Sequence, residues 1–214
     1  MLSKDEMDSE MITIVSGIPR SGTSMMMQML SAGGMAALTD GVRVPDANNP
    51  RGYFEWTPIK SLAKNPDIIA AAEGKVVKVI SWLLKNLSTQ HNYRIIFMRR
   101  PLEEVIASQN RMLELLGMEV PPGPMKSVIV DFQKHLESTQ VWLAQQKNMT
   151  VLFYDYAGVV EKPHDAARAI SLFVGQDLDL EAMAKQVEGS LYREKAPTVQ
   201  IPLAANIEPS EAGP

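Results

Sequence analysis

The residues with the clearest chemical potential lie in one loop near the start of the sequence. The loop combines glycines, hydroxyl side chains and one cation, in the order Gly17, Ile18, Pro19, Arg20, Ser21, Gly22, Thr23 and Ser24. Glycine lets a backbone approach an anion closely, because a larger side chain would hold the anion away. Backbone N–H groups at the start of a helix and a guanidinium both bind phosphate oxygens. The loop therefore predicts a phosphate-binding site.

The segments on either side of this loop predict the elements that position it. Residues 11–16 form a short apolar run with β-branched side chains, which is typical of a buried strand. Gly22 opens a segment of good helix formers that continues to Leu30. A strand, a glycine loop and a helix in this order direct backbone N–H groups towards an anion.

The nucleotide-binding pattern G-x-x-x-x-G-K-[ST] is typical of sites that bind nucleoside triphosphates, and the loop can be compared with it position by position. The loop keeps Gly17, Gly22 and Ser24 of this pattern. Thr23 occupies the position of the lysine that binds the nucleotide phosphates, and Arg20 supplies the cation from inside the loop. We therefore interpret the loop as a phosphate cradle that does not favour nucleoside triphosphate hydrolysis.

The composition bounds the class of protein. A chain of 214 residues with 45% hydrophobic and 21% charged residues fits one globular domain. The formal net charge of −4 argues against a general nucleic-acid-binding protein, and the absence of cysteine excludes disulfides and thiolate metal sites. The first ten residues are charged, unlike a signal peptide, and no apolar run approaches the length of a membrane span. We expect a cytoplasmic protein.

The remaining pattern alternates strands with helices. Further strands are expected at residues 76–80, 95–98 and 150–154, and helices at residues 59–73, 102–116, 128–143, 163–174 and 181–187. Such alternation predicts an α/β domain with a mostly parallel sheet. Ligands then bind beyond the carboxyl ends of the strands. Arg20, Lys78 and Arg100 all fall at or near such ends.

Two segments resemble a known family. The segment from Pro19 to Ser24 is similar to the 5′-phosphosulfate loop of sulfotransferases that use 3′-phosphoadenosine-5′-phosphosulfate (PAPS). Cytosolic members carry lysine where this chain has Arg20, whereas Golgi-type and many bacterial members carry arginine. Family members also bind the 3′-phosphate of PAPS with an arginine at the end of a strand and a serine eight residues later. Arg100 and Ser108 have this spacing; the alternative is an arginine at a strand end and a solvated serine.

The resemblance departs from the cytosolic members at the catalytic base. Lys78 matches a lysine that those members carry two residues before a histidine base, but Ile80 occupies the position of that histidine. The three histidines of this chain show no partner spacing, and we expect structural or solvated roles for His91, His135 and His164. The base must then come from another part of the chain.

Glu55 is the candidate for this base. The segment from Asn49 to Glu55 resembles one in bacterial sulfotransferase-like proteins, and Golgi-type members use a glutamate base. The neighbouring aromatic side chains would shield this carboxylate partly from water and favour proton uptake. The alternative, which we weigh equally, is a loop carboxylate bonded to Arg51 or to the backbone.

The resemblance covers most of residues 11–195 and implies a single three-layer domain of the P-loop type. Residues 1–10 would be a flexible leader and residues 196–214 a C-terminal extension. The implied reaction moves a sulfuryl group from PAPS to a hydroxyl or amine of a small-molecule or glycan acceptor, leaving adenosine 3′,5′-bisphosphate. It needs no metal, and no nucleic acid or membrane span takes part.

The resemblance also implies roles for the site residues. Arg20 and residues 21–24 would bind the 5′-phosphate and the sulfuryl group, and Lys78 would assist the bridging oxygen. Arg193 lies where the family closes a basic segment over the nucleotide. Two rival functions remain: a P-loop kinase, which would need Mg²⁺ and a loop lysine, and a nucleotide-binding protein without catalysis. The sequence names neither the acceptor nor the oligomeric state.

Overall fold

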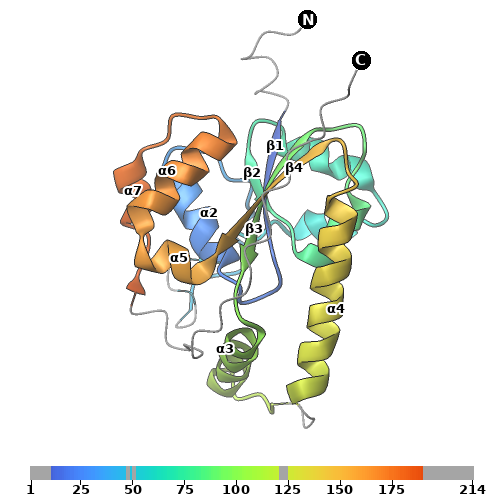
Figure 1. Ribbon diagram of the computed structural model, residues 1–214, viewed down its shortest axis with the longest axis vertical. Helices are drawn as coiled ribbons and strands as arrows, with labels where there is room; N and C mark the ends of the chain where they lie inside the picture. Colours follow the sequence, from blue (N-terminus) through green and yellow to red (C-terminus); the bar gives the residue numbers. More distant parts are fainter. Residues whose placement is uncertain (1–10, 47–48, 50–51, 121–124, 190–214) are drawn as a thin grey trace, which may run out of the picture.

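Four parallel strands form the central sheet of the computed structural model, which describes residues 11–46, 49, 52–120 and 125–189 (Figure 1). The strand order is β2-β1-β3-β4, with bounds Ile12–Ser16 for β1, Val76–Lys78 for β2, Tyr93–Arg99 for β3 and Met149–Asp155 for β4. β1 pairs in parallel with β2 on one side and with β3 on the other. The predicted α/β fold with a parallel sheet is confirmed.

Helices cover both faces of this sheet (Figure 1). Helices α2 (Thr23–Ala32), α6 (Pro163–Val174) and α7 (Leu180–Ala184) lie on one face. The other face carries α4 (Met125–Leu143) and three short 3-10 helices, η1 (Thr57–Ser61), η2 (Pro66–Ala72) and η3 (Ser81–Asn86). Because both faces are covered, adjacent strand residues such as Ile14 and Val15 enter different core clusters and both are buried.

Two helices continue past the carboxyl ends of the strands. Figure 1 shows α3 (Leu102–Leu115) and the first half of α4 below the sheet. Val105 and Ile106 at the start of α3 are buried, whereas Leu115 and Leu116 at its end are exposed. The apolar residues at the end of α3 are exposed because this end lies beyond the sheet that could cover it.

Several element boundaries differ from the sequence expectation. The helix expected over residues 59–73 is two 3-10 helices, and Pro66 begins the second of them. β2 ends at Lys78, two residues before the expected end, although the chain stays bonded to β1 and its loop through Val79 N to Val15 O and Ser81 N to Gly17 O until η3 begins at Ser81.

The end of the chain brings further differences. Helix α5 (Tyr156–Glu161), which directly follows β4, was not expected, and the helix expected at residues 181–187 is the shorter α7. The predicted leader at residues 1–10, the extension at residues 196–214 and Arg193 lie outside the described residues.

The glycine that precedes α2 provides a test of this packing. Gly22 and Gly34 both have strongly positive φ, +100° and +107°, but a Cβ on Gly22 would lie 2.4 Å from Cδ2 of Tyr156, whereas a Cβ on Gly34 would meet no atom within 4 Å. Both alanine variants suffer the same backbone strain, and only Gly22→Ala adds a clash. We expect Gly22→Ala to lose about 1–3 kcal/mol more unfolding free energy than Gly34→Ala in urea denaturation. Equal losses would show that Tyr156 does not limit the space at this turn.

Candidate functional site

The loop between β1 and α2 turns tightly at the carboxyl end of the sheet. Gly17 has φ +146°, and a Cβ there would lie 2.5 Å from Ser21 Oγ and 2.7 Å from the Met98 carbonyl oxygen. Gly22, in the left-handed region, is the residue immediately before α2. The first turn of an α-helix leaves N–H groups without intrahelical acceptors, and the helix dipole favours an anion there. Both glycines are therefore required for the shape that a phosphate loop needs.

Arg20 joins this loop to α3. Its backbone has φ 72°, which is uncommon for a residue with a side chain. Its Nε donates a hydrogen bond to Ser108 Oγ at 3.0 Å, and its Nη1 lies 3.8 Å from Met112 Sδ. Burial lowers the pKa of Arg20 from its ordinary value, although a guanidinium stays protonated at neutral pH. The fold thus brings together a cation and a hydroxyl that the sequence places 88 residues apart.

Arg100, directly after β3, bonds the backbone of the same loop. Its Nη1 donates to the carbonyl oxygen of Arg20 at 3.3 Å, and its Nε donates to Glu104 Oε2 at 2.9 Å. Its guanidinium carbon lies 4.6 Å from the ring centroid of Tyr156, within cation–π range. The side chains of Arg100 and Glu104 are only 6% and 2% exposed. Arg100 therefore lies beside Arg20, as its place at a strand end predicts, and also supports the loop from within the protein.

Lys78, the last residue of β2, contacts the first turn of α2. Its Nζ donates to Ser24 Oγ at 3.2 Å and to the carbonyl oxygen of Tyr53, which Ser24 Oγ also approaches. The pKa of Lys78 is lowered to about 8, mainly by burial; Glu55 partly offsets this effect, and Arg43 and Arg20 add to it. This amine therefore connects β2, the phosphate loop and the stretch before η1, which is described at residues 39–46, 49 and 52–57 and is called the 39–57 segment below.

Glu55 belongs to that segment, which packs on α2 and on the edge of β2. Gln28 of α2 donates to the Gly52 carbonyl oxygen at 3.3 Å, and Thr39 Oγ1 donates to the Glu55 carbonyl oxygen at 3.0 Å. The Glu55 side chain is 33% exposed, and its Oε1 pairs with Arg43 Nη1 at 2.9 Å. The partner in the structure is thus Arg43, whereas Arg51, considered from the sequence, lies outside the described residues.

Arg43 and its neighbours form a compact group around Glu55. The guanidinium carbon of Arg43 lies 3.4 Å from the ring centroid of Tyr53, and Tyr53 Oη donates to Asp46 Oδ1 at 2.8 Å. Burial raises the pKa of Tyr53, and its bond to Asp46 raises it further, so the phenol stays protonated and keeps donating. The Glu55 carboxylate is therefore held at a defined place within electrostatic reach of Lys78.

The family follows from comparison with known proteins. The model of the sulfotransferase domain matches residues 11–195. The chain belongs to the sulfotransferase domain family. No curated protein sequence gives a significant match.

One of two similar solved structures shows the same fold. The sulfotransferase domain from the olefin synthase of Synechococcus PCC 7002 has a TM-score of 0.51 and 15% identity, over 94% of this chain and 85% of that one. The sulfotransferase domain from the curacin biosynthetic pathway has a TM-score of 0.48 and 14% identity, over 88% of this chain and 92% of that one. At such low identity, the first of these shows a shared fold and nothing finer.

The three histidines of this sulfotransferase-family chain have different surroundings. His91 pairs with Glu73 and His164 with Glu181, in contacts of 3.0 and 3.2 Å that lie away from the phosphate loop. His135 instead comes from α4 to the end of β2, where its Nε2 lies 2.8 Å from Ser81 Oγ and its ring stacks on Trp82.

Sequence reasoning missed this position of His135, next to Ile80, where cytosolic members have their histidine. The signal that could have found it is helical spacing, because His135 follows Phe132 by three residues on the inward face of α4. Burial lowers the pKa of His135, and Lys85 lowers it further, so both effects favour the neutral ring.

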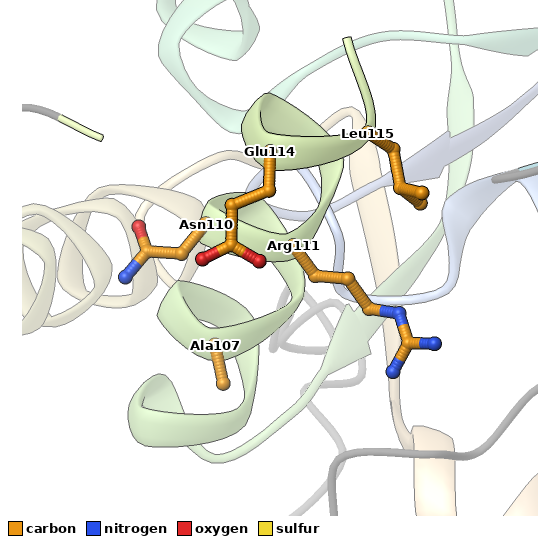
Figure 2. A pocket seen from close by; sticks show the side chains of 5 residues that line it. All are labelled: Ala107, Asn110, Arg111, Glu114 and Leu115. Atoms are coloured by element: carbon orange, nitrogen blue, oxygen red, sulfur yellow. The ribbon is translucent and has the colours of Figure 1, made fainter. Parts of the chain in front are cut away.

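A second candidate site is a hollow on the surface of α3. Figure 2 shows an open hollow of about 430 Å³ on α3, lined by Ala107, Asn110, Arg111, Glu114 and Leu115. All five side chains come from one helix, so no polar groups from other elements converge there.

Within the described residues, no group of three or more His, Asp or Glu side chains could hold a metal ion. Among the helices of the described part, none combines the length and apolar character needed to cross a membrane.

Lys78 gives a pH-dependent prediction. The unfolded chain keeps the proton on this lysine up to about pH 10.5, whereas the folded protein releases it near pH 8. The folded state is therefore destabilised by the buried charge below pH 8, and the wild type gains stability as pH rises from about 8 to 10.5. Relative to Lys78→Met, we expect a gain on the order of 3 kcal/mol across this window in urea unfolding. Parallel pH profiles for the two proteins would contradict burial of a charged amine at this position.

Proposed function

We propose that this member of the sulfotransferase domain family transfers a sulfuryl group from PAPS to a hydroxyl or amine of a small-molecule acceptor. The observation that carries the proposal is the contact between its two motif segments. Arg20 of the phosphate loop bonds Ser108 of α3, and Arg100 bonds the backbone of Arg20. Cations and a hydroxyl suited to two separate phosphate groups therefore lie at one end of the parallel sheet, where α/β proteins bind their ligands.

The donor would be bound by groups from three elements. The loop residues Ser21, Gly22, Thr23 and Ser24 and the start of α2 suit the 5′-phosphate and the sulfuryl group, with Arg20 supplying positive charge. Ser108 and Arg100 suit the 3′-phosphate, because a hydroxyl donor and a guanidinium both bond phosphate oxygens. Arg193, which lies outside the described residues, stays a candidate for the same nucleotide on the strength of the sequence.

In the proposed transfer, the acceptor oxygen attacks sulfur as the bond between sulfur and the bridging phosphate oxygen breaks. The products are the sulfated acceptor and adenosine 3′,5′-bisphosphate. Lys78 would donate a hydrogen bond to the bridging oxygen as negative charge develops there; with a pKa of about 8, its amine is mostly protonated at pH 7. Arg20 stabilises charge without giving up a proton. Such a reaction depends on positioning and charge and assigns no step to a metal.

The acceptor proton needs a base, and we propose Glu55 for this role. Its carboxylate lies within electrostatic reach of Lys78, which is the group closest to the bond that breaks in this scheme. Arg43 bonds Oε1, so the proposal assigns the proton to Oε2. The contact with Arg43 also gives the carboxylate a defined orientation, which a general base requires.

Nucleotide binding tests the donor site. We expect calorimetry to show that adenosine 3′,5′-bisphosphate binds at least tenfold more tightly than adenosine 5′-phosphate, because charge-assisted bonds to the extra phosphate add affinity. Ser108→Ala should narrow this difference, whereas Ser138→Ala, at an exposed serine on α4, should leave it unchanged. We choose Ser108 because loss of the buried Arg100 side chain would leave Glu104 without that cation. Equal affinity for both nucleotides in the wild type would contradict the 3′-phosphate site.

A turnover assay with PAPS and an acceptor panel tests the reaction itself. Sulfated product should form in EDTA at an undiminished rate. An absolute requirement for Mg²⁺, with ATP as the better donor, would favour the kinase alternative. Nucleotide binding with no turnover on any acceptor would favour a non-catalytic role.

Glu55→Gln tests the base. The variant should bind adenosine 3′,5′-bisphosphate like the wild type, because the amide keeps the size of the side chain. Its kcat should fall by a factor of about 10²–10⁴, the usual effect of losing a general base. Glu73→Gln is the matched control, since Glu73 is another carboxylate paired with a basic side chain but lies away from the loop. Normal turnover by Glu55→Gln would assign this carboxylate to the scaffold.

A further inference from the structure

Three rings meet at the end of β2 and form a surface that the proposed transfer does not yet use. Trp82 of η3 stacks on His135 of α4, with ring centroids 4.1 Å apart and planes 4° apart. The edge of Phe132 meets Trp82 at a centroid distance of 5.7 Å. Trp82 remains 41% exposed despite these contacts. We call Trp82, Phe132 and His135 the ring surface.

The ring surface adjoins the phosphate loop. The backbone N–H of Ser81, the residue before Trp82, donates to the Gly17 carbonyl oxygen at 3.1 Å. Ser81 Oγ then bonds His135 Nε2 at 2.8 Å, so two consecutive contacts connect the phosphate loop to α4. The ring surface therefore lies close to the place where the sulfuryl group would be bound.

Apolar side chains extend this surface in two directions. Ile80, 40% exposed, has extended backbone and follows Lys78 by two residues, so the two side chains leave the chain on the same side. Val128, 42% exposed, lies one helical turn before Phe132 on α4. Exposed apolar side chains gathered from two separate elements mark a binding surface more often than isolated ones do.

Polar groups at the ring surface already bond each other. Ser81 is buried, and its hydroxyl is paired with His135 Nε2, so these two atoms bond each other rather than the several hydroxyls of a sugar. A flat aromatic ring needs no such partners, because it stacks on indole and buries apolar area. The ring surface therefore suits a planar aromatic acceptor better than a sugar.

We propose that the ring surface binds the acceptor and that the acceptor is a planar aromatic alcohol. The inference rests on the proposed sulfuryl transfer and adds no chemical step to it. The aromatic body would lie on Trp82 beside Ile80, and its hydroxyl would point towards Lys78 and the phosphate loop. Trp82 then determines acceptor specificity, while the loop determines the donor.

The test uses 2-naphthol as the aromatic probe and methyl glucoside as the polar one. In the wild type, kcat/KM with PAPS should be at least tenfold higher for 2-naphthol than for methyl glucoside. Trp82→Ala should lower kcat/KM for 2-naphthol by about tenfold, mainly through KM, as expected for a residue at the centre of a binding surface. Trp82→Phe should restore most of this loss, because it keeps a ring.

Matched controls separate the ring surface from general damage. Phe132→Ala should raise the KM for 2-naphthol, whereas Val141→Ala, on the same helix but 62% exposed, should not. Every variant should bind adenosine 3′,5′-bisphosphate with wild-type affinity, which also shows that it is folded.

The outcomes distinguish the inference from the function on which it rests. Failure of the wild type to bind adenosine 3′,5′-bisphosphate would overturn the proposed function and the inference with it. Normal nucleotide binding with methyl glucoside as the better acceptor would overturn the inference alone. An unchanged KM for 2-naphthol in Trp82→Ala would do the same.

Discussion

The buried guanidinium of Arg100 is the contact on which the rest of the site depends. Burying a charge costs much free energy unless hydrogen bonds and an opposite charge compensate it. Arg100 has both, because it bonds Glu104 of α3 and the carbonyl oxygen of Arg20, and its guanidinium faces the ring of Tyr156 in α5. One side chain from the end of β3 therefore sets the relative positions of the phosphate loop, α3 and α5.

Lys78 provides a second connection of the same kind on the opposite side of the loop. Its amine bonds Ser24 in the first turn of α2 and the carbonyl oxygen of Tyr53 in the 39–57 segment. The same burial that brings it into contact with these groups lowers its pKa to about 8. Arg100 and Lys78 thus contact one loop from two sides, and both are cations at the carboxyl ends of β3 and β2, the two strands that flank β1.

Much of the fold and part of the site could be predicted from local patterns. The apolar runs predicted β1, β3 and β4, because strands buried on both faces read as continuous hydrophobic segments. Sequence reasoning was less accurate for the helix expected over residues 59–73. Pro66 has no N–H to continue a preceding helix, so the segment forms two 3-10 helices and Pro66 begins the second.

The sequence by itself determined the glycine loop between β1 and α2, since glycine spacing acts on the conformation of adjacent residues and a strand followed by a helix needs no distant partner. It also determined which cations stand at strand ends. Only the tertiary structure decided which side chains meet across the fold. The pairing of Glu55 with Arg43 depends on how the 39–57 segment folds back, and His135 reaches Ser81 across 54 residues because α4 packs over the end of β2. Such contacts arise from the packing of whole elements, which no local spacing records.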